Sequence, residues 1–258
     1  MEFIDKTRIS FAVNQLFSKI WKEPLAIADT TTPKHLICTL NTHSFITALD
    51  DQGFYQALLK SDILIPDGVG VVFGLKLLYG EKIRKIAGYD LFELEMKELN
   101  NSNGKCFFLG SSLKVLDLII KRAAVDYPNV KVDFNSPPYS PEFALEENEL
   151  MIQKINSFSP SVLFIGMTAP KQEKWAFANL NKLNVGHVCC IGAVFDYYAG
   201  TKKRAPKWMI DNGFEWMYRL ITEPRRTWRR YLVNNFRFIL LIVKEKLKNK
   251  HNIIDLKN

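Results

Sequence analysis

Short apolar runs alternate with longer stretches of helical periodicity along most of the chain. Several of the runs are apolar at consecutive positions, which is typical of strands covered on both faces. This alternation predicts an α/β fold with a Rossmann-like, mostly parallel sheet and helices on both faces. The predicted strands are HLICTL (35–40), DILIP (62–66), KCFFLG (105–110), VKVDF (130–134), SVLFIGM (161–167) and HVCCIGAVF (187–195).

The dipeptide Asp67-Gly68 has two interpretations. An Asp-Gly between two apolar runs is the strongest short-range signal for a β-hairpin. The following segment, 69–79, is however long and leucine-rich, with apolar residues at roughly helical spacing, so a helix fits it better. In that case Asp67 lies just beyond the carboxyl end of a strand, where open α/β sheets bind their ligands.

Other small or polar residues follow the predicted strands at the same edge. Helix capping alone explains a serine at such a position, but a series of glycine, proline and polar residues at one edge favours a ligand crevice. These residues are Thr39 and Asn41 after the first strand, Gly110 to Ser112 after KCFFL, Gly166 to Glu173 after SVLFI, and Gly192 to Asp196 after HVCCI.

The pattern changes after Pro206. Apolar residues recur every three or four positions with arginines between them, which predicts one or two amphipathic basic helices broken near Pro224. The longest purely apolar run, 238–243, is far shorter than the ~20 residues of a membrane span. We therefore divide the chain into a catalytic α/β domain (1–200) and a basic helical appendage (201–258). The appendage either lies on a membrane or packs on the core with solvated arginines.

The net charge of +8 is concentrated in the appendage, where lysines and arginines far outnumber acidic residues. Such an excess indicates an anionic partner: nucleic acid, an acidic membrane surface or a pyrophosphate-bearing ligand. The amino terminus, MEFIDKTRIS, resembles neither a signal peptide nor a membrane span, so we expect a cytoplasmic protein.

The sequence contains only weak signals for a metal site or for a dinucleotide-binding site. The four cysteines lie inside apolar segments without CxxC spacing, and no Asp-x-Asp occurs, so we expect reduced core thiols and no metal site. Gly68, Gly70 and Gly74 have the spacing GxGxxxG, with Asp90 about 20 residues further on, which is the alternative of an NAD(P)-dependent oxidoreductase. Asp67 would then stand next to an anionic pyrophosphate, which disfavours that alternative.

A set of collinear motifs resembles the WecG/TagA/CpsF family of glycosyltransferases and covers about three quarters of the chain. Each motif is weak alone, whereas the ordered set is specific. The motifs are TLNTHSF (39–45), SDILIPDG (61–68), AGYDLFE (87–93), PKQE (170–173), GAVFDYYAG (192–200), KRAPKWM (203–209), GFEWMYRL (213–220), EPRR (223–226) and WRRYL (228–232).

The resemblance implies an inverting, metal-independent enzyme without a cofactor, peripheral on the inner face of the cytoplasmic membrane. It would move a sugar, with N-acetylmannosamine favoured over a glucosyl or uronic acid donor, from a UDP-sugar to a polyprenyl-pyrophosphate-linked acceptor. The basic helices would touch the membrane and act as a lid over the site. Exposed apolar residues in this tail are compatible with self-association, and nucleic-acid binding by the tail is the minor alternative. In this resemblance Asp67 is the general base and Thr39 a catalytic neighbour. The implied substrate-binding residues are Asn41, Gly68, Gly110, Gln172, Gly192, Asp196, Arg219, Arg225, Arg226 and Arg229.

This chain departs from the family pattern at two loops. Thr168-Ala169 stands where Gly-Ser usually precedes PKQE, and Gly192-Ala193-Val194 stands where Gly-Gly-Ala is usual. Glycine permits a close backbone approach to a ligand that a side chain hinders. The departures therefore imply a different approach of these loops to the nucleotide.

Overall fold

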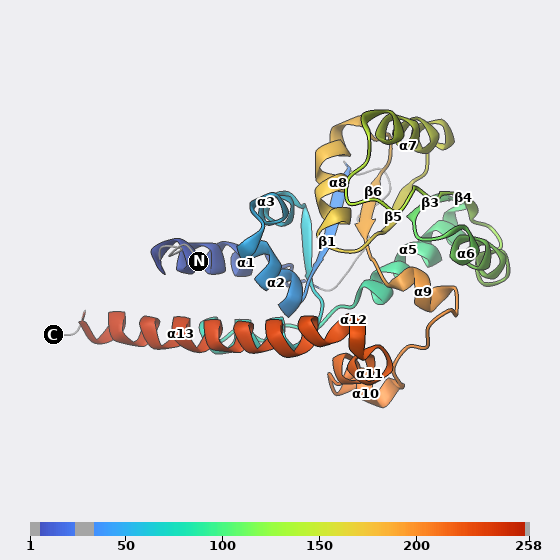
Figure 1. Ribbon diagram of the computed structural model, residues 1–258. Coiled ribbons are helices and arrows are strands. Elements are labelled where there is room, and N and C mark those ends of the chain that lie inside the picture. Colours follow the sequence, from blue (N-terminus) through green and yellow to red (C-terminus); the bar gives the residue numbers. More distant parts are fainter. Residues whose placement is uncertain (1–5, 24–33, 256–258) are drawn as a thin grey trace.

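The computed structural model describes residues 6–23 and 34–255 and contains one six-stranded sheet with every strand parallel (Figure 1). The strand order is β2-β1-β6-β5-β3-β4. The predicted α/β class and the parallel sheet are therefore confirmed. The strands are β1 (His35–Leu40), β2 (Ile63–Pro66), β3 (Lys105–Gly110), β4 (Lys131–Asn135), β5 (Val162–Gly166) and β6 (His187–Cys190).

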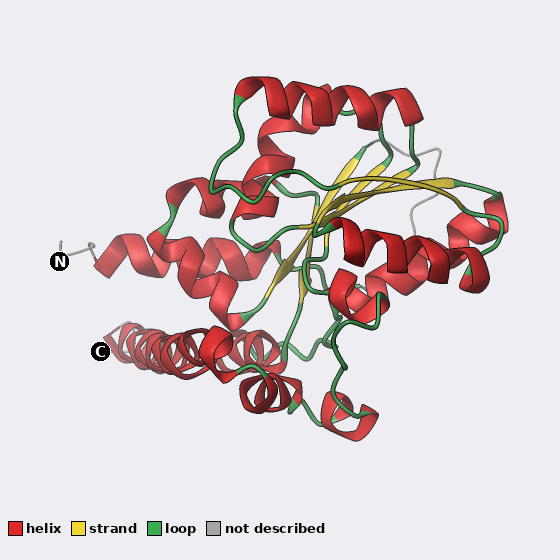
Figure 2. Cartoon of the chain, turned by 45° about the vertical axis from the view of Figure 1, so that its right-hand side comes forward, coloured by secondary structure: helices red, strands yellow, loops and turns green. Residues whose placement is uncertain are grey.

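Helices cover both faces of this twisted sheet, as Figure 2 shows. The helical stretch that follows the first strand forms two helices. Asp51 ends the first of them and caps the second by accepting a hydrogen bond from Phe54 N. The helices are α1 (Lys6–Lys19), α2 (Thr42–Asp50), α3 (Gln52–Lys60), α4 (Val69–Tyr79), α5 (Gly88–Ser102), α6 (Leu113–Asp126), α7 (Leu145–Phe158), α8 (Lys171–Asn179), α9 (Val194–Tyr198), α10 (Lys207–Asp211), α11 (Glu215–Thr222), α12 (Pro224–Trp228) and α13 (Asn234–Asp255). A 3₁₀ turn (Leu180–Lys182) and a π-helical segment (Arg229–Val233) complete them.

The hairpin interpretation of Asp67-Gly68 is wrong, and the helix prediction is confirmed. Strand β2 pairs with β1 in parallel, and α4 starts at Val69. Gly68 turns the chain between them with φ of +114°, a conformation that favours glycine. Asp67 consequently sits at the carboxyl end of β2.

The last predicted strand is too long. Strand β6 ends at Cys190, Gly192 adopts a left-handed φ of +54°, and α9 begins at Val194. An apolar run contains no information about such a turn, because helix α9 is as apolar as the strand that precedes it. Helix α1 was not predicted at all, although it lies partly buried against the sheet layer: Leu16 and Phe17 belong to the core.

Two apolar layers pack on the sheet. One contains the aromatic rings of Phe17, Phe45 and Phe238, with Phe45 5.0 Å from Phe17 and 5.2 Å from Phe238 between ring centroids. The other contains Phe92 and Phe164, 5.2 Å apart. Edge and tilted ring pairs of this kind add stability beyond the area that they bury.

Helix α13 belongs to the first of these layers. It packs against α2 and α4, and it extends past the body of the protein beside them (Figure 1). Its residues Phe238 and Ile242 are buried in this layer. The Arg237 guanidinium donates to both carboxylate oxygens of Asp50, at 2.8 and 3.0 Å, and fixes its start to α2. The chain breaks at Pro224, as predicted, while the division into two domains at residue 200 stays a prediction.

Candidate active site

Two cavities meet at the carboxyl edge of the sheet. The larger, of about 640 Å³, lies between α4, α11 and α13; the smaller, of about 350 Å³, lies over the ends of β1, β5 and β6. The side chains that line both cavities therefore mark their junction. They are Asn41, Asp67, Glu215, Arg219, Arg230 and Tyr231.

The larger cavity is mainly apolar. Phe73 and Leu77 of α4 form one wall, and Trp216 of α11 lies at its mouth. Helix α13 closes it with a row of apolar side chains at helical spacing, namely Phe238, Ile239, Ile242 and Val243. A cavity of this composition suits a hydrocarbon ligand.

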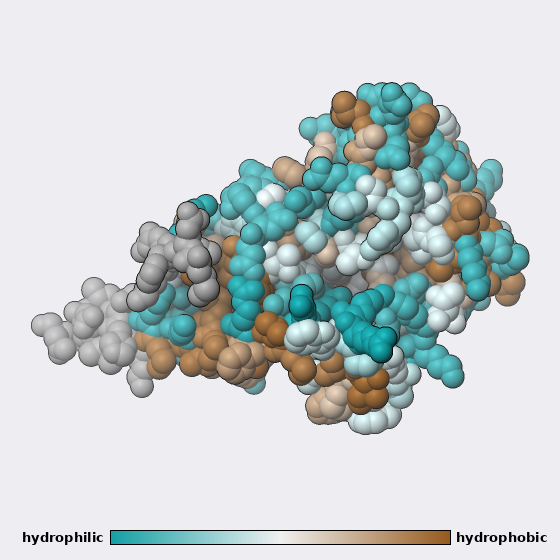
Figure 3. Space-filling model, in the orientation of Figure 1, coloured by the Kyte–Doolittle hydropathy of each residue, from teal (hydrophilic) through white to brown (hydrophobic). Residues whose placement is uncertain are grey.

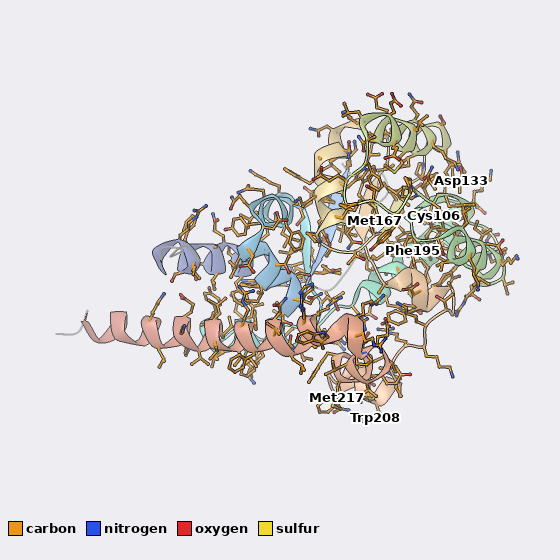
Figure 4. All side chains as sticks on the ribbon, viewed as in Figure 1. Cys106, Asp133, Met167, Phe195, Trp208 and Met217 are labelled. Atoms are coloured by element: carbon orange, nitrogen blue, oxygen red, sulfur yellow. The ribbon has the colours of Figure 1, made fainter. Side chains whose placement is uncertain are left out.

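The smaller cavity is polar and collects residues from segments far apart in the sequence. Thr39, near the end of β1, lines this cavity, and the chain segments after β5 and β6 form its sides; Figure 4 labels Met167 and Phe195, which belong to these segments. Cations from the appendage face it: Arg219, Arg226, Arg229 and Arg230. Clustered guanidinium groups are suited to binding phosphate oxygens.

Asp67 is held in place by the sheet. Its backbone N–H donates to Leu40 O at 2.9 Å and extends the parallel pairing by one residue. Burial raises the pKa of the Asp67 carboxyl, and the nearby Glu215 carboxylate raises it further. The cations Arg219, Arg230 and Lys85 oppose part of this increase in the pKa. A carboxylate with a raised pKa is a stronger base than an ordinary aspartate.

Arg219 and Glu215 form the charged part of the junction. Arg219 Nη2 donates to Glu215 Oε1 at 2.8 Å, and the guanidinium lies 5.0 Å from the ring centre of Tyr197. Lys85 Nζ is 4.0 Å from Glu215 Oε2. The Nε atoms of Arg219 and Arg230 are buried without a hydrogen-bond partner in the described part of the chain. Both arginines thus keep donor capacity for an anionic ligand.

Gln172 and Glu173 form a buried polar pair on the wall of the smaller cavity. Gln172 Nε2 donates to Glu173 Oε1 at 2.8 Å. The Oε1 atom of Gln172 and the Oε2 atom of Glu173 are buried and have no hydrogen-bond partner within residues 6–23 and 34–255. Burial raises the pKa of Glu173 to about 7. The pair offers acceptor oxygens to hydroxyl or amide groups of a ligand.

Most of the residues predicted from sequence come together here. Gly68 lines the apolar cavity, whereas Gly110 and Arg225 line neither cavity. Gly110 has φ of +114°, and a Cβ there would lie 2.8 Å from Gly166 O. Glycine is therefore required at this position by the backbone conformation and by the close approach of the neighbouring strand. Arg225 is exposed on α12. The predicted residues that line the polar cavity are Thr39, Asn41, Asp67, Gln172, Gly192, Asp196, Arg219, Arg226 and Arg229. Their individual roles stay predictions.

Sequence analysis missed charged residues at the junction and next to it. Lys85 lies in the irregular segment before α5, and no pattern distinguishes it from a solvated lysine. Glu215 is part of a motif, but acidic residues in the first turn of a helix are common. The sequence signal for its pairing is the spacing to Arg219, which lies four residues further on and therefore on the same face of the helix.

The glycines behind the dinucleotide alternative have a packing role. A Cβ on Gly74 would lie 2.8 Å from Phe17 Cζ, and one on Gly70 would collide with Thr42. Asp90 accepts a hydrogen bond from Ala87 N at 2.9 Å and caps α5; it does not follow a second strand. The structure thereby removes the basis of that alternative.

Within the described part of the chain, no three His, Cys, Asp or Glu side chains lie together in a way that could hold a metal ion. All four cysteines are buried as free thiols. Asp196, in the first turn of α9, pairs with Lys202 at 2.9 Å.

The chain is similar to known glycosyl transferases. The model of the glycosyl transferase WecG/TagA/CpsF family matches residues 12–252. The N-acetylglucosaminyldiphosphoundecaprenol N-acetyl-beta-D-mannosaminyltransferase of Bacillus subtilis (strain 168) is 31% identical over 215 residues, covering 83% of this chain and 81% of the relative. The enzyme of the same name from Staphylococcus aureus (strain NCTC 8325) is 26% identical over 221 residues, covering 86% and 85%.

Proposed function

This chain belongs to the WecG/TagA/CpsF family of glycosyl transferases, and on that premise we propose that it transfers N-acetylmannosamine from a UDP-sugar to a polyprenyl-pyrophosphate-linked N-acetylglucosamine. The relatives are named for the same transfer to an undecaprenyl-diphosphate-linked sugar. The product would serve the synthesis of a bacterial surface polysaccharide or teichoic acid.

The observation that supports this proposal best is the position of Asp67 at the junction of a polar and an apolar cavity. A lipid-linked sugar acceptor has an apolar chain and a polar head, and a sugar nucleotide is polar throughout. We assign the nucleotide to the polar cavity and the first part of the lipid to the apolar one. The two reacting groups then meet beside Asp67.

The donor's charge would be neutralised by the appendage. Two phosphates in the polar cavity would face Arg219, Arg226 and Arg229, and guanidinium groups bind phosphate in a bidentate manner. With these cations in place the transfer needs no divalent metal. The Gln172 and Glu173 oxygens would accept hydrogen bonds from donor hydroxyl groups.

The chemistry is a displacement with inversion. The Asp67 carboxylate takes the proton of the acceptor hydroxyl as its oxygen attacks the anomeric carbon. The bond between that carbon and the UDP oxygen breaks, and UDP leaves with the electron pair, stabilised by the arginines. Thr39 lines the cavity beside the base and would position the donor.

The appendage is also the proposed membrane contact. Many large exposed apolar side chains of the described residues lie after position 207, between α10 and α13, and Figure 3 shows a brown surface along the lower edge, where these helices lie. Trp208 and Met217 project from the end of that surface in Figure 4. We name it the apolar ridge, defined by Trp208, Met217, Ile221, Phe236 and Ile239. Within the described ranges, no helix combines the length and apolar composition needed to cross a bilayer.

Two further features of the proposal concern partners and place. Arg219 and Arg230 turn toward the cavities, which favours a phosphate ligand over the alternative of nucleic acid for these side chains. An apolar ridge can also support self-association. We propose a protein peripheral to the inner face of the cytoplasmic membrane, and light scattering at increasing concentration tests whether it forms oligomers.

Transfer itself is the first expected result. The purified protein, incubated in EDTA with UDP-N-acetylmannosamine and a short-chain polyprenyl-pyrophosphoryl-N-acetylglucosamine, should release UDP and form a disaccharide lipid detectable by mass spectrometry. UDP-glucose and UDP-glucuronic acid serve as donor controls. Turnover that appears only after addition of Mg²⁺ or Mn²⁺ would contradict metal-independent transfer, and the absence of any product would overturn the proposed function.

Membrane binding is tested on the apolar ridge. Because Phe238 and Ile242 are buried in the core, surface substitutions are better than truncation. We expect the triple variant Trp208→Ser, Ile221→Ser, Phe236→Ser to bind phosphatidylglycerol vesicles about 10-fold or more weakly in sedimentation, since each side chain loses apolar area from the bilayer. Binding by the parent protein should fall as salt increases.

The matched control for the ridge is the pair Val125→Ser and Leu150→Ser, which are exposed apolar residues on α6 and α7. This variant should bind vesicles as the parent does. Equal weakening by the control variant, or unchanged binding by the ridge variant, would show that the ridge is not the membrane contact.

A further inference from the structure

Glu215 is a partly buried carboxylate that the proposed reaction does not use. Its side chain accepts a hydrogen bond from Arg219 at 2.8 Å, and its other oxygen lies 4.0 Å from Lys85 Nζ. It lines both cavities, as Asp67 does. Arg219, which lines the polar cavity where a pyrophosphate is expected, and Lys85, which lines the adjoining apolar cavity, are therefore both engaged by an acidic side chain of the protein itself.

The groups around this carboxylate come from three parts of the chain. Arg219 lies on the same helix, Lys85 precedes α5, and Asp67 follows β2. Arg230, from the π-helical segment, lines the same junction. Three cations and two carboxylates thus line the larger cavity, and the other four charges all act on Asp67.

We propose, resting on the proposed function, that Glu215 is a positioning residue that holds Arg219 and Lys85 beside Asp67 until the donor's pyrophosphate displaces it from them. A carboxylate and a phosphate offer similar oxygen geometry to a guanidinium group. The carboxylate therefore keeps the cations arranged for phosphate, and it competes with the phosphate for them.

The same charge acts on the base. Glu215 is one of the groups that raise the pKa of Asp67, while Arg219, Arg230 and Lys85 lower it. When the cations turn to the pyrophosphate, the carboxylate remains close to Asp67. Its repulsion makes proton removal from the acceptor by Asp67 more favourable. Glu215 thus weakens donor binding and strengthens the base.

Weaker donor binding and a stronger base are opposite effects on activity, and a residue that only stabilises the fold would not produce both. In Glu215→Gln we expect UDP to bind about 3- to 10-fold more tightly by calorimetry, since a competing negative charge is gone. Turnover at saturating UDP-N-acetylmannosamine should instead fall several-fold. The base is active when deprotonated, so activity falls as the pH falls through its pKa; without Glu215 that pKa is lower, and the acidic limb of the kcat profile should move to lower pH.

The control variant is Glu245→Gln on α13, a buried acid paired with Lys248 outside both cavities. Its UDP affinity and acidic limb should match those of the parent. Glu215→Asp, which keeps the charge, should restore much of the turnover. Thermal unfolding of each variant checks that it is folded.

The outcomes are distinguishable. If the parent binds UDP and transfers sugar, but Glu215→Gln binds UDP equally or more weakly with an unchanged acidic limb, the role of Glu215 is overturned and the proposed function stands. If the parent itself neither binds UDP nor transfers sugar, the proposed function fails and this inference fails with it.

Discussion

Asp67→Asn should reduce sugar transfer by about 10²- to 10⁴-fold, the usual contribution of a general base. The substitution keeps the size of the side chain and removes its ability to accept a proton. Asp67 N donates to Leu40 O through the backbone, so the end of β2 should stay in place. UDP affinity should be equal to or higher than that of the parent, because one negative charge leaves the junction. Initial rates and calorimetry with UDP measure the two effects.

Asp62→Asn is the matched control for this prediction. Asp62 lies just before β2, at the opposite end from Asp67, and its carboxylate accepts a hydrogen bond from Leu36 N at 2.7 Å. The asparagine oxygen can accept the same bond, so activity should stay close to that of the parent. Unchanged turnover in Asp67→Asn would eliminate Asp67 as the base.

Phe238→Ala should lower the free energy of unfolding by about 3–5 kcal/mol, the usual effect of removing a buried phenylalanine ring. The ring is only 2% exposed and packs edge-on against Phe45 at 5.2 Å. Its removal leaves a cavity between α13 and the body next to Gly74, where no side chain can move in from the helix. Urea denaturation followed by circular dichroism measures the change.

Phe236→Ala, two residues earlier on the same helix, is the control. Its side chain is 62% exposed, so the free energy of unfolding should change by less than about 0.5 kcal/mol. Since Phe238 also lines the apolar cavity, Phe238→Ala should raise the KM for the lipid acceptor more than that for the donor. Equal stability of the two variants would show that α13 does not contribute to the core.

The sequence by itself was sufficient for the class of fold. Its alternation of apolar runs and helical stretches predicted all six strands and the α4 helix, because each of these features depends on local periodicity. It also placed Asp67 at a strand end, since the carboxyl ends of parallel strands share one edge. The ordered motifs identified the family, which the comparisons then established.

Local patterns failed where a turn or a docking partner decides the structure. The end of β6 depends on the left-handed turn at Gly192, and helix α1 is recognisable only by the layer that buries Leu16 and Phe17. An amphipathic pattern in the appendage fits both a membrane-bound helix and a helix packed on the core. The structure buries one face of α13 and leaves another exposed, which the sequence does not specify.

Only the tertiary structure could bring together the charges of the site. Asp67, Lys85 and Glu215 are separated by up to 148 residues in the chain, yet they line one cavity, because the carboxyl edge of the sheet and the appendage meet there. The pKa of a carboxylate depends on its burial and on the charges within a few ångströms. Neither quantity is a property of the local sequence, so the raised pKa of Asp67 and the position of Glu215 follow from the tertiary structure, in which α11 and the end of β2 line the same cavity.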